Sequence, residues 1–162
     1  MKNEPLVTDL VDGKTLKTDE KIEFFGQVDE LSAFIMDFSH SIENTRLVME
    51  LRKIANLLSV ILAEVAGGLG HLGEKHLEEL VELVDEYNKK AGGFQCIMLL
   101  GETPIGAKAH IVRTVARRAE RAYARLYEKQ GGSELIFEYL NKLSSLFFAI
   151  GKMYDNGQSS PF

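Results

Sequence analysis

The stretch that decides the fold is residues 105–126, IGAKAHIVRTVARRAERAYARL. Its apolar side chains recur at spacings of three and four, which predicts one buried face of a helix. The residues on this face are Val112, Val115, Ala116, Ala119, Tyr123 and Leu126. A second face carries Arg113, Arg117 and Arg121 at intervals of four, with Glu120 three residues beyond Arg117. We therefore expect a long helix with an apolar side and a cationic side.

The row of arginines allows two interpretations. Stacked guanidinium groups repel each other unless something anionic lies between them. Carboxylates of the same protein can fill that role in a solvated, ion-paired helix face, and spacing alone favours this interpretation. Phosphate can fill it as well, because the planar fork of arginine matches phosphate oxygens bidentately.

Helix boundaries on both sides of this stretch are marked by capping residues. Thr103 followed by Pro104 is typical of a helix start, and Gly131-Gly132 ends the helix near Gln130. Ser133 is then predicted to cap a last helix, which runs to about Tyr154. Its apolar stripe comprises Ile136, Tyr139, Leu140, Leu143, Phe147, Ile150 and Met153.

Three more amphipathic stripes precede this pair. Their spacing predicts helices from Thr18 to about residue 42, from about 47 to 66 and from about 74 to 90. The apolar run 94–100, FQCIMLL, could be a strand by periodicity, and we interpret it as a buried loop.

Five long amphipathic helices joined by short glycine-rich connections predict an all-α fold, a five-helix bundle. The length suits one domain, 1–162, with an irregular N-terminal segment at 1–17 and a frayed tail at 155–162.

Composition excludes several classes of protein. A net charge of −5 argues against a general binder of nucleic acid or anionic membranes, although basic residues concentrate in the 105–126 helix. The single cysteine, Cys96, rules out an internal disulfide framework and fits a reducing compartment. The N-terminus lacks the apolar core of a signal peptide, and no run reaches the roughly 20 apolar residues of a membrane helix. These features predict a cytoplasmic protein.

Common catalytic motifs are missing. The four histidines form no HExxH or i,i+4 pair and no CxxC is present, so we expect no metal held by the protein. Cys96 has no evident partner histidine, and no GxSxG occurs. The glycines at 67–70 follow a helix rather than a strand, so they indicate a helix stop and not a phosphate loop.

Two polar positions stand apart from this pattern. Asp29 and Glu30 are either a solvated pair or include a carboxylate that bonds an arginine of the central helix. Asn141 interrupts an aromatic stripe, which is compatible with a surface residue or with a group that bonds a ligand hydroxyl or phosphate.

Three segments together resemble a known family: FFGQVDELSAFI (24–35), HIVRTVARRAERAY (110–123) and YLNKLSSLFFAIG (139–151). The RTxxRRAER string is its specific mark, and the sequence is similar to PduO-type ATP:cob(I)alamin adenosyltransferases over roughly residues 13–152. The resemblance implies a five-helix bundle that forms a homotrimer with active sites between subunits. It also implies transfer of the 5′-deoxyadenosyl group of ATP, bound with Mg²⁺, to the cobalt of the substrate cob(I)alamin.

The resemblance assigns roles to particular residues. Those matching the family's ATP contacts are Lys17, Arg117, Arg118, Glu120, Arg121 and Asn141. Asp29 and Arg113 match a salt bridge that the family places across the subunit interface, and with Arg117 they are the candidate catalytic residues. Cob(I)alamin is itself the nucleophile, so such a protein aligns the reactants and neutralises the departing triphosphate.

The sequence also departs from the family pattern. Residues 1–12 contain no glycine, so the family's glycine-rich TRTGDxGxT segment around the triphosphate is absent. Ile97 replaces the phenylalanine that packs against the corrin, Glu102 replaces a glycine, and Ser145 replaces an aspartate. The resemblance thus supports a divergent adenosyltransferase. The alternative is a non-catalytic homologue that binds a nucleotide, a corrinoid or a protein partner.

Overall fold

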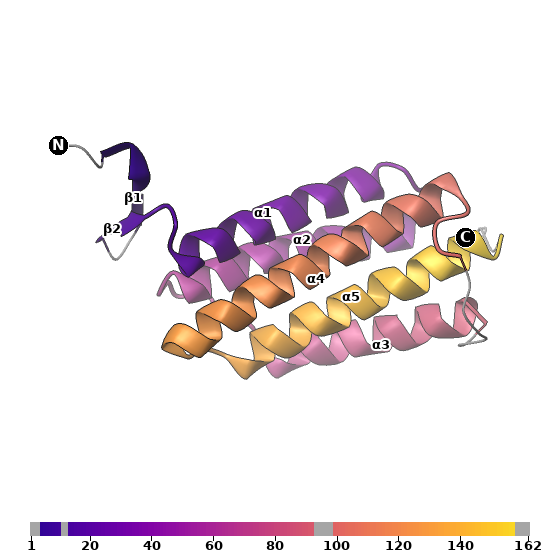
Figure 1. The fold of residues 1–162 in the computed structure, drawn as a ribbon. Coiled ribbons are helices and arrows are strands. Elements are labelled where there is room, and N and C mark those ends of the chain that lie inside the picture. The colour runs from indigo at the N-terminus through magenta and orange to yellow at the C-terminus, as the bar shows by residue number, and fades with distance from the viewer. Residues whose placement is uncertain (1–3, 11–12, 93–98, 158–162) are drawn as a thin grey trace.

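Five helices build the protein in the computed structural model, which describes residues 4–10, 13–92 and 99–157 (Figure 1). They are α1 (Glu20–Ser39), α2 (Thr45–Val65), α3 (Glu74–Lys90), α4 (Pro104–Gln130) and α5 (Glu134–Asp155). The predicted all-α five-helix bundle is confirmed.

The central helix of the bundle is α4, which packs against α1 on one side and α5 on the other (Figure 1). Lys129 near the end of α4 bonds to Glu20 at the start of α1, and Lys108 near the start of α4 bonds to Asp37 near the end of α1. The two helices are therefore antiparallel. Outside this layer α2 packs on α1, and α3 packs on α5.

The core is made by the apolar stripes that the sequence predicts. Every member of the α4 stripe is buried. Its two alanines, Ala116 and Ala119, are fully buried together with Ala109, which lets the neighbouring helices approach closely. Aromatic rings join α1 to both other helices of this layer. The ring centroids of Phe24 and Tyr123 of α4 are 5.0 Å apart, and those of Phe38 and Phe147 of α5 are 5.7 Å apart.

The structure confirms the predicted cap of α4 and corrects the predicted start of α1. Thr103 caps α4 through its hydroxyl, which accepts from the N–H of Gly106 at 2.9 Å. For α1 the cap is Asp19 rather than Thr18, because the Asp19 carboxylate accepts from the N–H of Lys21 at 2.9 Å. Ser133 occupies the N-cap position of α5 but makes no capping bond with its side chain.

The prediction of an irregular N-terminal segment was wrong. A 3₁₀ turn at Glu4–Leu6 leads into a hairpin of β1 (Val7–Leu10) and β2 (Gly13–Leu16), which pair antiparallel. Gly13 has a φ of 126°, a conformation that other residues rarely adopt, and so the chain can reverse there. The hairpin stands apart from the helices, with Leu6 and Leu16 about half exposed (Figure 1).

The predicted frayed tail was also wrong at its beginning. Helix α5 continues through Asp155, whose side chain is fully buried, and Asn156 caps the helix. Residues 158–162, like 93–98, lie outside the described part of the chain, so the predicted buried loop at 94–100 is described only at its end. None of the helices in the described residues has the length and apolar character needed to cross a membrane.

Candidate functional site

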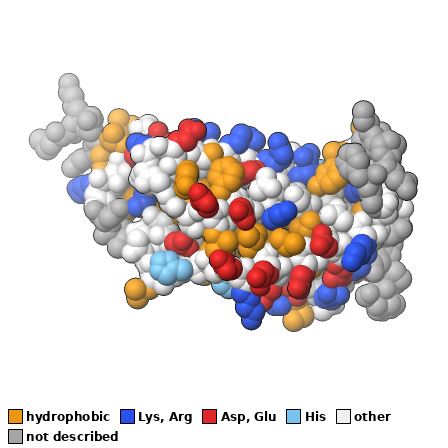
Figure 2. Space-filling model, turned by 90° about the horizontal axis from the view of Figure 1, so that it is seen from below, with side chains coloured by type: hydrophobic (Ala, Val, Ile, Leu, Met, Phe, Trp, Pro, Cys, Tyr) orange, Lys and Arg blue, Asp and Glu red, His pale blue; other side chains and the backbone are white. Residues whose placement is uncertain are grey.

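The arginine row lies on the outer face of α4. Arg117 and Arg121 are exposed and Arg113 is half buried, and among the described residues none of the three has an ion-pair partner. The carboxylates of the described residues thus do not neutralise these guanidinium groups. Acidic side chains gather elsewhere, over α3, in the face shown in Figure 2, where Glu78, Glu82 and Asp85 are exposed. The protein is acidic overall but locally cationic along α4.

Arg118 faces α1 and is held there. Its Nη2 lies 2.5 Å from Oε2 of Glu30, and its Nε donates to Oε1 of Gln27 at 2.6 Å. One carboxylate of the Asp29–Glu30 pair therefore does bond an arginine of the central helix, as one interpretation of the sequence anticipated. Asp29 is exposed. In the chain as described, Arg118 joins two helices rather than extending the free row.

Glu120 and Asn141 meet across the α4–α5 interface. The Asn141 side-chain amide donates to Oε1 of Glu120 at 2.9 Å, which brings together two of the residues that the resemblance assigns to ATP. The bond fixes the amide so that its oxygen can still accept from a ligand. Ser144 also bonds the backbone carbonyl of Asn141, at 2.8 Å.

Arg113 has a buried polar atom without a partner. Its Nε is inaccessible and finds no acceptor among the described residues. Burial and the neighbouring charge of Arg117 lower its pKa from the ordinary value of arginine. No ion pair joins Arg113 and Asp29 among the described residues. A buried donor without an acceptor is costly, so an acceptor from outside the described residues would stabilise this side chain.

Two predicted residues lie away from this cluster. Lys17 follows β2, is exposed, and uses its backbone N–H to bond the Leu6 carbonyl at 2.8 Å. The hairpin is at the end of the bundle where α1 begins and α4 ends (Figure 1). Ile97, the substituted corrin-facing position, lies outside the described residues.

A buried polar cluster that the sequence did not predict lies at the start of α4. The Asp155 carboxylate accepts from the backbone N–H of Gly101 at 2.8 Å and of Thr103 at 3.0 Å, and His110 Nε2 lies 3.3 Å away. Gly106 leaves the space, because a Cβ there would lie 2.0 Å from Asp155 Oδ1. The sequence signal that could have indicated this cluster is Gly106, a glycine in the first turn of a long helix.

Both members of this cluster have shifted pKa values. Burial lowers the pKa of His110, against the opposing effect of Asp155 and with a further lowering from Arg113. For Asp155, burial alone acts to raise the pKa, but the N–H donors of Thr103 and Gly101 outweigh it, and the pKa is lowered. His110 is therefore neutral and Asp155 is ionised at pH 7.

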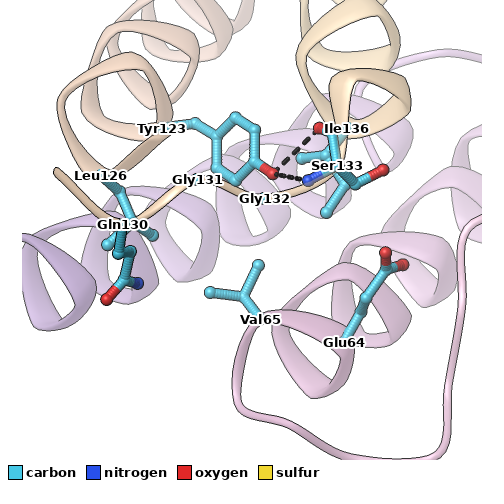
Figure 3. A pocket seen from close by; sticks show the side chains of 9 residues that line it. All are labelled: Glu64, Val65, Tyr123, Leu126, Gln130, Gly131, Gly132, Ser133 and Ile136. Carbon is cyan, nitrogen blue, oxygen red and sulfur yellow. Dashed lines mark hydrogen bonds between the residues drawn. The ribbon is translucent and has the colours of Figure 1, made fainter. Parts of the chain in front are cut away.

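A cavity lies on the other side of α4. It has a volume of about 500 Å³ and opens where α2 and α4 end and α5 begins (Figure 3). Tyr123 lines it and bonds the backbone of Ser133 through its hydroxyl, with Glu64 across the opening (Figure 3). Tyr123 belongs to the apolar stripe, so this cavity does not receive the arginine row.

The sequence profile of the cobalamin adenosyltransferase family matches residues 7–154, and the chain belongs to this family. The match begins at β1, so it includes the hairpin that precedes the segments on which the resemblance was based. A Bacillus subtilis corrinoid adenosyltransferase is 31% identical over 154 residues, which cover 90% of this chain and 80% of the relative. A Citrobacter freundii corrinoid adenosyltransferase is 28% identical over 85% of this chain and 82% of its own length.

The fold is shared with solved structures. A variant PduO-type ATP:corrinoid adenosyltransferase from Lactobacillus reuteri, complexed with cobalamin and ATP, superposes with a TM-score of 0.88. The alignment covers 98% of this chain and 93% of that one at 24% identity. The comparison therefore supports the bundle architecture, and family membership rests on the sequence matches.

The lowered pKa of His110 predicts a pH dependence of stability. Below about pH 6.5 the unfolded chain takes up a proton that native His110 does not, so the free energy of unfolding falls as the pH drops through the window below 6.5. Replacing His110 by Gln should flatten this dependence between pH 7 and 5, measured by denaturant unfolding. His71→Gln, which changes an exposed side chain, is the control. An unchanged slope in the His110 variant would contradict the assignment.

Proposed function

We propose that this chain is an ATP:corrinoid adenosyltransferase, which transfers the 5′-deoxyadenosyl group of ATP to the cobalt of cob(I)alamin. The observation that carries the proposal is the row of Arg113, Arg117 and Arg121, which lacks an anionic partner in the described chain. The Bacillus subtilis and Citrobacter freundii relatives are corrinoid adenosyltransferases, which supports a corrinoid as the substrate of this chain.

The reaction depends more on neutralising the charge of the departing triphosphate than on transferring a proton. The Co(I) electron pair attacks C5′ of the ribose, a Co–C bond forms, and the C5′–O bond breaks with release of triphosphate. Arg117 and Arg121 can stabilise the negative charge of the leaving group, because guanidinium binds phosphate oxygens bidentately. Lys17 can add a further positive charge from the hairpin. Asn141, oriented by Glu120, can bond the nucleoside.

Arg118 has a different role in this proposal. Its bonds to Glu30 and Gln27 occupy the guanidinium, so it contacts ATP only if it leaves α1. We assign it first to holding α4 against α1, with nucleotide contact as the prediction from the family.

ATP offers better ligands for a magnesium ion than the described side chains of the protein do. Among the residues that the structure describes, no group of three His, Cys, Asp or Glu side chains is placed to hold a metal ion. We propose that Mg²⁺ arrives with ATP and is held by the triphosphate oxygens. The arginines then bind a triphosphate whose negative charge Mg²⁺ has partly neutralised.

We further propose a cytoplasmic homotrimer with the reaction site between subunits. The unpartnered Nε of Arg113 supports an acceptor from a second copy, and Asp29 is exposed to offer one. Exposed apolar side chains, such as Ile111 of α4 and Leu16 of the hairpin, support further contact between copies.

The activity can be tested directly. Purified protein given MgATP and chemically reduced cobalamin should form adenosylcobalamin, followed by its absorbance and by chromatography. A relative with established activity is assayed in parallel. If that relative forms product and this chain forms none, the proposal fails, and retained ATP binding would then favour the non-catalytic alternative.

Arg117 should carry much of the ATP affinity. Saturating ATP at about 100 times its Kd should stabilise the protein by about 2.7 kcal/mol, visible as a higher melting temperature. Arg117→Ala should abolish this shift, whereas Arg52→Ala, which changes an exposed arginine on α2, should retain it. Equal shifts in both variants would place ATP elsewhere.

Arg113 should be needed for assembly. If its guanidinium pairs with Asp29 of a second copy, Arg113→Ala leaves a buried carboxylate unpaired, at a cost of roughly 3–5 kcal/mol for each interface. Sedimentation equilibrium should then show a weaker trimer, while Arg52→Ala on α2 should leave it unchanged. A trimer of undiminished stability in the Arg113 variant would exclude this pairing.

A further inference from the structure

The cavity at the ends of α2 and α4 has no part in the proposed reaction. Its volume of about 500 Å³ is in the range of sites that bind small organic molecules. Val65 of α2, Leu126 of α4 and Ile136 of α5 give it an apolar wall. Among the described residues that line it, Glu64 is the one acidic side chain, and it points toward the turn between α4 and α5 (Figure 3). The cavity therefore combines an apolar wall with one carboxylate.

Glu64 is largely shielded from water and has one oxygen left for a ligand. Its side chain is only 16% exposed. Oε2 accepts from the backbone N–H of Leu72 at 2.7 Å, which holds the loop that follows α2. Among the described residues, Oε1 accepts no hydrogen bond, since the Nδ1 of His71 lies 4.0 Å away. A charged donor inside the cavity would therefore give this oxygen a strong hydrogen bond.

The ends of two helices add partial negative charge beside Glu64. Helix α2 ends at Val65 and α4 ends at Gln130, and both residues line the cavity. The last carbonyl groups of each helix carry the negative end of its dipole, which favours a cation. The start of α5 also borders the cavity with the opposite sign, but Glu134 in its first turn reduces that positive potential. The electrostatics of the cavity thus favour a positively charged ligand.

We propose that this cavity binds a small organic cation, a primary alkylammonium compound. The ammonium donates to Oε1 of Glu64, and the alkyl chain lies against the apolar wall of Val65, Leu126 and Ile136. A metal ion fits the donor set less well, because one carboxylate supplies too few of the oxygen ligands that such ions need. The cavity and the arginine row lie on different sides of α4, so this site is separate from the proposed reaction.

An NMR titration of the purified protein with n-butylammonium tests the site. The amide signals of Gly132 and Ser133 should shift, because both residues line the cavity. The neutral n-butanol and the anionic butyrate should bind at least about tenfold more weakly, because neither gives Glu64 a charged donor. n-Pentylammonium should bind about fourfold more tightly, since one more CH₂ group is buried against the apolar wall. Equal affinities for n-butanol and n-butylammonium, or amide signals that do not shift, would overturn the proposal.

Two variants locate the ligand within the cavity. Glu64→Gln removes the charge but keeps an oxygen that can accept from Leu72, so the loop is held while the affinity for n-butylammonium falls at least about tenfold. Val65→Phe fills the cavity and should abolish binding although the carboxylate remains. Glu50→Gln is the control, because this carboxylate of α2 pairs with Lys53 outside the cavity. Undiminished affinity in the Glu64 or the Val65 variant would refute the site.

The same variants separate this site from the proposed function. Glu64→Gln should leave the ATP-induced rise in melting temperature unchanged, because Arg117 lies on a different side of α4. If the protein forms no adenosylcobalamin but binds n-butylammonium through Glu64, the cation site stands and the reaction assignment falls. Loss of the ATP-induced rise in Glu64→Gln would contradict the separation of the two sites.

Discussion

Burial of the apolar stripe of α4 between α1 and α5 is the constraint on which the site depends. Once Val112, Ala116 and Ala119 face inward, the helical period leaves the arginines nowhere but the outer surface. No separate interaction is needed to direct them there. The hydrophobic effect, which is not directional by itself, sets the direction of a row of charges through the geometry of one helix.

Polar contacts then divide the charged side chains of α4 into those that bond to other helices and those that do not. Arg118 bonds to Glu30 and Gln27 of α1, and Glu120 accepts a hydrogen bond from Asn141 of α5. A polar contact therefore links α4 to each of these two neighbouring helices. Arg117 and Arg121 remain exposed, and Arg113 retains a buried donor that finds no acceptor in the part of the chain that the structure describes. In a family member this division separates arginines that hold the bundle from arginines that can meet phosphate or a second copy.

The helices could be predicted from sequence because their apolar spacing matches the helical period throughout. The hairpin could not, since β1 and β2 are four residues each and their pairing depends on a turn with Gly13 at positive φ. Asp155 was predicted to be in a frayed tail because its partners are backbone N–H groups about fifty residues away, which no side-chain pattern reveals. Likewise, the resemblance placed Arg118 among the ATP contacts, but the sequence could not show that Glu30 lies opposite it.

The central claim is that the exposed arginines of α4 recognise phosphate, and calorimetric titration with ATP and with adenosine tests it most directly. Two charge-assisted contacts of about 1.5–3 kcal/mol each predict that ATP binds at least about 100-fold more tightly than adenosine, with an advantage that shrinks as salt is added. Equal affinities for the two ligands, or an ATP affinity insensitive to salt, would contradict the account.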